Sequence, residues 1–368
     1  MASNGELTAS GLNGTTIDGA ASVNFGVVNT LTVNGAAGDD IISLNSTAAA
    51  IANDVTIDGG TDNDKISITG RFGADLVLVG GTGLDTISIS KSTVAVDLGL
   101  DAGDGNNRVT VSDSTVGHDA ILQSGIDNDS VAVSRTAVKR DLSLTDADGN
   151  NAFRIVNSSS RRDTLVVLGD GNDSLVVTGH SAGVKAGATA LGLISIDCGD
   201  GINVLSMSRS KALGSRIGDG IAVVSGVGND VLSIVDSRSA GLIQVDAGDG
   251  GDRVELTRVV TTGIGDLDIT TGLGADSVKL DRVLIGGVGD VDTGLGDDIL
   301  QITNSRFTGE FDAIMGDGND VAYVSSNFYA ATGSSVDGGL GIDAVTRGGN
   351  NPVNRVTISF ENIRFRVL

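Results

Sequence analysis

The chain has few of the residues that usually build disulfide frameworks, linkers or aromatic clefts. Its 368 residues include one cysteine, one proline and no tryptophan, and aromatic residues make up 3%. A single cysteine excludes a disulfide framework, so we expect Cys198 to be a small buried hydrophobic residue. One proline beside 55 glycines fits neither collagen nor a proline-rich linker. The scarcity of aromatic residues argues against an aromatic-lined ligand cleft.

The chain also has few basic residues for its number of acidic ones, and it has no long apolar run. It has 24 basic and 47 acidic residues, for a net charge of −23. This balance argues against nucleic-acid binding and favours solubility and cation binding. No apolar run approaches the ~18 residues of a membrane span. The first six residues are not a signal peptide, so we expect earlier signal removal, another export route or an intracellular protein.

The chain contains a repeated sequence motif. In each copy a glycine-rich turn ends in an aspartate or asparagine, and a strand-like run follows. Its clearest copy is Gly169–Val177, GDGNDSLVV. We call the acid position zero. Successive copies lie 21 to 30 residues apart, and most are 22 apart. The position-zero residues are Asp40, Asp64, Asp85, Asn107, Asp129, Asn151, Asp173, Asn203, Asp230, Asp252, Asp276, Asp298, Asp320 and Asp343. A fixed period of this length indicates a solenoid.

Apolar residues keep a constant register relative to position zero. One pair follows at two and four residues, as in Leu300 and Ile302, and another precedes at nine and seven, as in Ile243 and Val245. Alternation with period two indicates half-buried strands, which cannot bury their apolar faces alone. We therefore predict an all-β, right-handed parallel β-solenoid of about 14 coils with ~22 residues per coil.

The repeat suggests three segments. We expect residues 1–30 to form a degenerate coil or cap, residues 31–347 to form the solenoid, and residues 348–368 to form the last strand and a C-terminal cap or assembly segment. Two neighbouring coils are over-long, at residues 179–187 and 209–216. Such insertions mark a binding face in some solenoids, and tolerated loop variation is the plainer interpretation.

Position zero is the main candidate for chemistry, since it is aspartate in 11 of 14 coils and asparagine in three. Carboxylates stacked about 5 Å apart repel one another. Calcium would offset the repulsion, because it takes carboxylate and backbone carbonyl oxygens. The alternative is an Asx turn, in which each side chain accepts hydrogen bonds from N–H groups of the turn. The residues alone leave both interpretations open.

Several copies resemble the RTX nonapeptide, G-G-x-G-x-D-x-U-x. The copies are Gly80–Ser88, Gly338–Thr346 and, more loosely, Gly59–Ile66. The resemblance implies a secreted bacterial β-roll protein that binds Ca²⁺ in its glycine turns. The ligands it implies are Asp64, Asp85, Asp129, Asp173, Asp230, Asp252, Asp276, Asp298, Asp320 and Asp343. This chain departs from the family in having one such turn per coil rather than two.

The opposite turn collects basic residues. Of the 24 in the chain, 15 fall there, among them Arg71, Arg135, Arg258, Arg282 and Arg306. One interpretation is that rods associate through lateral edges or rod ends into a homo-oligomer or filament, or bind an anionic surface polysaccharide. The other is that charges are simply solvated there.

From these features we expect an extracellular or cell-surface structural or adhesive rod that binds calcium and possesses no catalytic residues. The alternative is a carbohydrate-active parallel β-helix enzyme, a polysaccharide lyase or glycosidase. His118 and His180 are isolated in the sequence and give no metal or catalytic motif.

Overall fold

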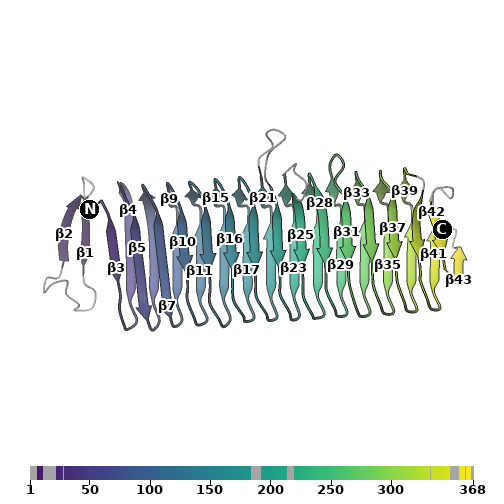
Figure 1. The fold of residues 1–368 in the computed structure, drawn as a ribbon. Coiled ribbons are helices and arrows are strands. Elements are labelled where there is room, and N and C mark those ends of the chain that lie inside the picture. The colour runs from purple at the N-terminus through teal and green to yellow at the C-terminus, as the bar shows by residue number, and fades with distance from the viewer. Residues whose placement is uncertain are drawn as a thin grey trace. The chain divides into compact units, whose positions relative to one another are not determined.

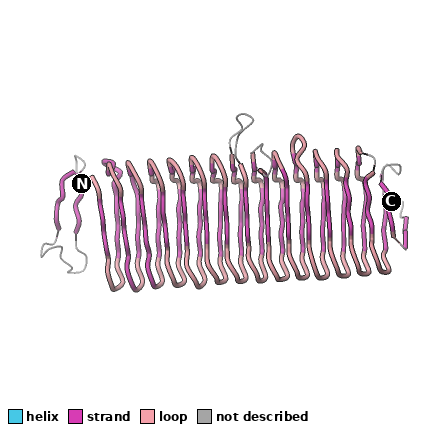
Figure 2. The backbone as a smooth tube through the Cα atoms, viewed as in Figure 1, coloured by secondary structure: helices cyan, strands magenta, loops and turns pink. Residues whose placement is uncertain are grey.

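The computed structural model describes residues 6–10, 22–27, 29–183, 192–213, 219–331, 333–348, 356–360 and 362–365. Two compact units make up the chain, Met1–Asp146 and Ala147–Leu368. All the regular elements of these residues are strands, and Figure 2 shows strands and loops with no helix among them. Accordingly, the described residues hold no apolar helix that could cross a membrane.

Within each unit the strands form two parallel sheets (Figure 1). We call sheet 1 the sheet whose strands lead into the glycine turns, and sheet 2 the sheet whose strands leave them. The fold is a parallel β-solenoid of about 14 coils with ~22 residues each, as the sequence predicts. Its right-handedness stays a prediction.

The first unit opens with an antiparallel pair, β1 (Glu6–Ser10) and β2 (Ser22–Val27). Its sheet 1 contains β3 (Leu31–Asn34), β5 (Val55–Thr61), β7 (Leu76–Thr82), β10 (Leu98–Asp101), β13 (Ala120–Gln123) and β16 (Leu142–Thr145). Its sheet 2 contains β4 (Ile41–Ile51), β6 (Lys65–Phe72), β8 (Thr86–Ser90), β11 (Arg108–Ser112) and β14 (Ser130–Ser134), with the short strands β9 (Thr93–Val94), β12 (Thr115–Val116) and β15 (Ala137–Val138).

The second unit repeats this plan. Its sheet 1 contains β19 (Thr164–Val167), β22 (Ile194–Asp197), β25 (Gly220–Val224), β28 (Leu242–Asp246), β31 (Leu267–Thr270), β34 (Gly289–Asp292), β37 (Phe311–Ile314), β40 (Ser334–Asp337) and β42 (Val356–Ser359). Its sheet 2 contains β17 (Ala152–Val156), β20 (Ser174–Thr178), β23 (Val204–Ser208), β26 (Val231–Val235), β29 (Arg253–Thr257), β32 (Ser277–Asp281), β35 (Ile299–Thr303), β38 (Val321–Ser325), β41 (Ala344–Gly348) and β43 (Asn362–Phe365). The short strands are β18 (Ser159–Ser160), β21 (Ser181–Ala182), β24 (Lys211–Ala212), β27 (Arg238–Ser239), β30 (Val260–Thr261), β33 (Leu284–Ile285), β36 (Arg306–Phe307) and β39 (Phe328–Tyr329).

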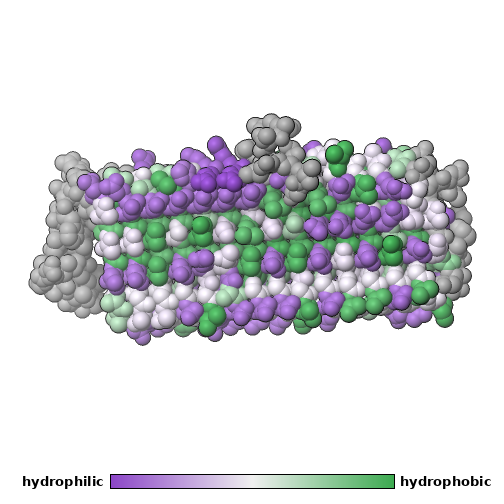
Figure 3. Space-filling view, in the orientation of Figure 1, coloured by the Kyte–Doolittle hydropathy of each residue, from purple (hydrophilic) through white to green (hydrophobic). Residues whose placement is uncertain are grey.

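Parallel pairing places equivalent residues of neighbouring coils side by side. Leu256 pairs with Leu280, and Leu280 pairs with Ile302. All three are fully buried, because their strands alternate between the core and the surface. The same register is visible on the surface. Figure 3 shows outward side chains of similar hydropathy in rows that cross the coils of each unit. The predicted apolar columns are therefore confirmed as the core.

The short strands supply a third inward column that the sequence prediction missed. Its residue lies about nine places after position zero, as in Val94, Val116, Ile285 and Phe307, all buried. The chain enters this strand through a corner residue in the left-handed region, such as Arg135 with φ of 47°. This conformation is uncommon for a non-glycine residue. The opposite turn is thus two corners with a strand between them.

Three aromatic rings fill the core of the later coils. Phe307 and Phe311 have ring centroids 4.1 Å apart, and Tyr329 stacks on Phe307 at 5.4 Å. Gly289 occupies an inward site of β34 in the coil before Phe311. A Cβ atom there would lie 2.8 Å from the Phe311 ring, so the glycine makes room for the larger side chain.

Ile42 and Arg347 occupy inward positions but are only half-buried, since they lie in the first and last coils. Cys198 is 1% exposed and burial raises the pKa of its thiol to about 12, which confirms a buried hydrophobic role. Of the over-long coils, residues 184–187 and 214–216 lie outside the described residues. The division at residues 30 and 347 stays a prediction.

We predict that Leu300→Ala lowers the free energy of unfolding by about 2–5 kcal/mol, because the side chain is fully buried and leaves a cavity. The neighbouring Gln301→Ala faces outward and should change it by less than about 0.5 kcal/mol. Urea unfolding followed by circular dichroism measures both. Equal losses would contradict the assigned inward and outward faces.

Candidate functional site

The position-zero residue closes each glycine turn and comes directly before a strand of sheet 2. Asp298, for example, precedes β35. The ten predicted calcium ligands are all buried, with exposed fractions of 0 to 3%. Asn107, Asn151 and Asn203 are equally buried. The sequence therefore located a real column of inward-facing side chains within each unit.

In twelve coils one oxygen of the position-zero side chain accepts a hydrogen bond from the backbone of the preceding coil. The donor is the N–H of that coil's own position-zero residue, at 2.6 to 3.0 Å. Asp64 Oδ1, for example, accepts from Asp40 N–H at 2.8 Å. In return Lys65 N–H donates to Asp40 C=O at 2.8 Å. We call this repeated arrangement the inner ladder.

The inner ladder provides an acceptor for a backbone N–H group that makes no hydrogen bond within the sheets. At the corner the chain leaves sheet register, and a buried N–H without a partner is costly. The side chain of the next coil supplies the missing acceptor. The position-zero side chain therefore holds neighbouring coils together, a role that neither sequence interpretation contained.

The second oxygen, Oδ2, lies under the turn. In Asp40, Asp64, Asp85, Asp252 and Asp320 this atom is buried without a hydrogen-bond partner. It lies close to the residue five places before position zero. A Cβ atom on Gly59 would lie 2.4 Å from Asp64 Oδ2. At Gly59 and Gly80 the missing side chain thus leaves the space that Oδ2 occupies.

The asparagine coils show which atoms surround Nδ2, the asparagine counterpart of aspartate Oδ2. Asn107 Nδ2 donates to Gly103 C=O at 2.8 Å. Asn203 Nδ2 donates to Gly199 C=O at 3.1 Å and to Gly201 C=O at 3.4 Å. These carbonyls belong to the glycine turn of the same coil. In an aspartate coil an acceptor oxygen stands where asparagine places a donor.

Burial raises the pKa of the position-zero carboxyl groups. The pKa is raised to about 7 in Asp129, Asp252 and Asp320 and to about 6 in Asp298. Desolvation is the largest cause in each, because a charge is unfavourable away from water. Hydrogen bonds from the preceding coil oppose the shift. Burial also raises the pKa of Asp64, Asp85, Asp230 and Asp276.

Glycine is required in the turn for two reasons. Gly272 and Gly274 have φ of 80° and 139°, a region that favours glycine. A Cβ atom on Gly274 would also lie 1.4 Å from the carbonyl oxygen of Gly250 in the preceding coil. The glycines thus let the backbones of neighbouring turns approach closely.

Asx turns are present, but a different aspartate makes them. Asp101 Oδ1 accepts from Gly103 N–H at 3.0 Å, and Asp292 Oδ1 accepts from Gly294 N–H at 3.0 Å. These aspartates stand six residues before position zero. The Asx turn, one of the two interpretations left open for position zero, is therefore made by a different residue, because Oδ1 of position zero accepts from an N–H group of the preceding coil.

Further ladders run through the other corners. Asn63 N–H donates to Asp39 Oδ1 at 2.9 Å on the outside of the glycine turn. Asp119 N–H donates to Asp97 Oδ1 at 2.8 Å where the chain enters sheet 1. Ser92 N–H donates to Ser114 Oγ at 3.1 Å beyond sheet 2. Serine seven residues after position zero is a sequence pattern that could have revealed the last of these.

The position-zero oxygens are a poor donor set for calcium. Calcium takes six to eight oxygen ligands. Here Oδ1 of Asp64 accepts a hydrogen bond from an N–H group, and its other carboxylate oxygen, Oδ2, is shielded from solvent. No group of three or more histidine, cysteine, aspartate or glutamate residues within the described ranges could hold a metal ion. The residues do not fit a calcium ion as arranged.

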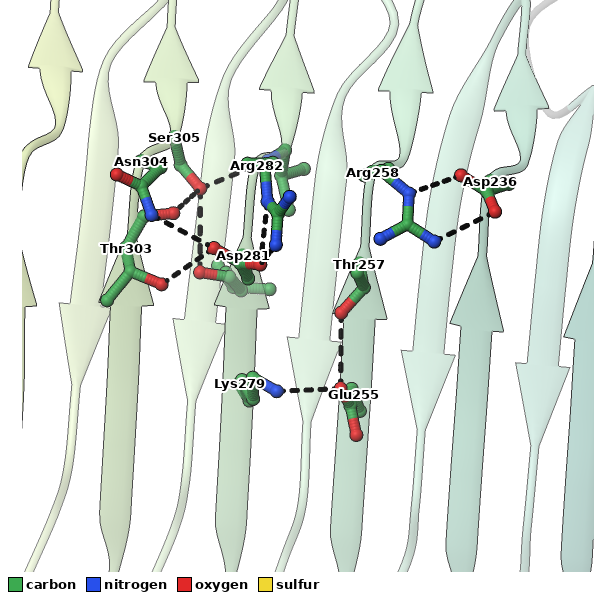
Figure 4. A network of polar contacts seen from close by, with 12 residues as sticks. Asp236, Glu255, Thr257, Arg258, Lys279, Asp281, Arg282, Thr303, Asn304 and Ser305 are labelled. Atoms are coloured by element: carbon green, nitrogen blue, oxygen red, sulfur yellow. Dashed lines mark hydrogen bonds and ion pairs between the residues drawn. The ribbon is translucent and has the colours of Figure 1, made fainter.

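The basic residues of the opposite corners are partly neutralised within the chain. Arg258 binds both carboxylate oxygens of Asp236, with Nε at 2.5 Å and Nη2 at 2.9 Å (Figure 4). Arg135 binds Asp113 in the same way, and Arg282 contacts Asp281. Such pairs leave less positive charge for the acidic edge of another copy.

The histidines form no catalytic arrangement among the residues that are placed. His118 is exposed and lies 3.9 Å from Asp97. His180 is buried, where its Nε2 lies 2.8 Å from the hydroxyl of Thr164, which contacts Ser160 at 2.9 Å. Burial lowers the pKa of His180 to about 4. This chain of polar groups is sealed in the core and serves packing.

Comparison with known protein families, with curated proteins and with solved structures finds no match for the chain. The likeness to RTX proteins therefore rests on the motifs alone.

We predict that Gly105→Ala lowers the free energy of unfolding by more than about 1 kcal/mol. Gly105 has φ of 114°, and a Cβ atom would lie 1.8 Å from Gly83 C=O. Gly99→Ala in the same coil is the control, because the nearest atom to its Cβ is 3.9 Å away. Urea unfolding compares them. Similar losses in both variants would contradict the close stacking of the turns.

Proposed function

We propose that the chain is an extracellular or cell-surface structural or adhesive solenoid whose flat outer faces contact a surface polysaccharide. The observation that supports this most is the in-register repetition of outward polar side chains. In the first unit Ser43, Ser67, Ser88 and Thr110 pair in four successive coils of sheet 2. Repetition at the strand spacing of about 4.8 Å suits a polymer with many equivalent groups better than a single small ligand.

A second hydroxyl row runs beside the first. Thr69, Ser90, Ser112 and Ser134 occupy the outward site two residues further along β6, β8, β11 and β14. Thr69 Oγ1 and Ser90 Oγ lie 3.2 Å apart, so adjacent hydroxyls are within hydrogen-bond distance. We call the two rows together the hydroxyl face. Its short side chains leave a flat surface with donors and acceptors that a sugar chain can use.

The use of polar side chains at the corners also favours a scaffold over an enzyme. The corner carboxylates, amides and hydroxyls described above are bound to neighbouring coils. Polar groups committed to holding the backbone are poorly placed to act on a substrate. The net charge of −23 keeps such a surface soluble. A secreted location follows from the proposal and from the RTX resemblance.

We predict that the purified chain is retained by an insoluble polysaccharide such as cellulose or chitin and that Ser67→Lys with Ser88→Lys reduces retention at least tenfold. The two lysines project from the centre of the hydroxyl face and block close approach. Gln123→Lys with Ser143→Lys adds the same charge to the outward side of sheet 1 and should bind as the natural chain does.

Three results would count against this proposal. If both double variants lost retention equally, the added charge would act generally and not through the hydroxyl face. If no polysaccharide retained the natural chain, a polysaccharide would not be its partner. Release of soluble reducing ends from the polymer would instead support the carbohydrate-active enzyme.

A further inference from the structure

We infer that the position-zero column is a ladder of neutral side chains, carboxylic acids and amides together, and that it stabilises the coils without calcium. Each side chain presents one acceptor to the preceding coil and one donor to its own turn. In an asparagine coil the donor is the amide. In an aspartate coil the donor is the proton of the carboxylic acid. This inference stands apart from the proposed function.

Asparagine and aspartate are equivalent within one column. Asn203 Oδ1 accepts from Asp173 N–H at 3.0 Å, and Asp230 Oδ1 accepts from Asn203 N–H at 2.6 Å. The two oxygens perform the same task in successive coils. The remaining atom of Asn203 donates to two turn carbonyls. A protonated carboxyl group is the form of aspartate that can make the same set of hydrogen bonds.

Some aspartates of the column follow one another without an intervening asparagine. From Asp230 to Asp343 six successive coils carry aspartate at position zero. Ionised carboxylates at this spacing would repel one another in a buried column. The charges of Asp276 and Asp230 raise the pKa of Asp252. Those of Asp298 and Asp343 raise the pKa of Asp320 in the same way. Protonation removes the charge where no cation is in contact.

A further carboxyl group adds to the charge around the column in the first unit. Burial raises the pKa of Asp129 to about 7, and the nearby carboxyl group of Asp146, five places before position zero in the next coil, raises it further. A proton on Asp129 removes this repulsion.

The inference fixes the direction of pH dependence. The folded chain holds these protons more tightly than the unfolded chain, in which aspartate has a pKa near 3.9. The stabilisation is therefore fully present below about pH 4 and is lost as the pH rises toward about 7, the pKa of Asp252 and Asp320. An amide carries its donor at every pH, so asparagine should keep the stabilisation in alkaline solution.

The experiment compares melting temperatures of the full chain and a variant with Asp252→Asn and Asp320→Asn, at pH 5 and pH 8. Each condition is measured with 5 mM calcium chloride and with EDTA. We expect the variant to melt several degrees above the natural chain at pH 8 and close to it at pH 5. We expect calcium to leave both midpoints unchanged.

The matched control carries Asp249→Asn and Asp317→Asn. Both residues are exposed on the glycine turns of the same unit, so the variant removes the same charge from its surface. It should gain less at pH 8 than the column variant. A third variant, Asp252→Leu, lacks the acceptor for Asp230 N–H and should melt below the natural chain at both pH values.

Two outcomes would overturn the inference. One is a rise of several degrees with calcium in the natural chain that disappears in Asp252→Asn with Asp320→Asn, which would make the carboxylates metal ligands. The other is a column variant that melts lower than the natural chain at pH 8. The melting of the natural chain with calcium and with EDTA decides the first point even if a variant fails to fold.

Discussion

Every coil of this solenoid must satisfy the backbone polar groups of its corners. Along the strands the ladder of parallel hydrogen bonds does this without help from side chains. At a corner the chain turns out of register, and N–H groups such as that of Asp298 have no backbone acceptor. The molecule solves this with short acceptor side chains that reach one coil along, as Asp320 Oδ1 does at 2.8 Å. Aspartate, asparagine and serine are abundant because they have this reach.

This constraint explains why glycine and the inner ladder occur together. The side chain can meet the neighbouring N–H only if the two turns lie close, and Gly274 and Gly296 permit that approach by lacking Cβ atoms. A longer acid would overshoot the distance between coils. The near absence of glutamate, four residues in all, agrees with a role set by reach rather than by charge.

The fold was predictable because its determinants are periodic, whereas the site depended on where each oxygen points. Alternating residues such as Leu300 and Ile302 identify the strands, their inward faces and the coil length. The same pattern does not show the third inward column, because strands such as β36 (Arg306–Phe307) have two residues and give no alternation. Nor does it show whether Asp64 Oδ1 meets a metal, its own turn or another coil, since all three require an inward acid after a glycine turn.

The asparagine coils separate these possibilities, because asparagine copies the shape of aspartate without its charge. If cations held the column together, Asn203 would interrupt a row of charged ligands between Asp173 and Asp230. Instead it continues the same hydrogen bonds on both sides, at 3.0 and 2.6 Å. The property conserved from coil to coil in this chain is thus an acceptor pointing along the stack. Charge is incidental to that property, and so a motif that resembles a calcium turn can serve as a structural joint.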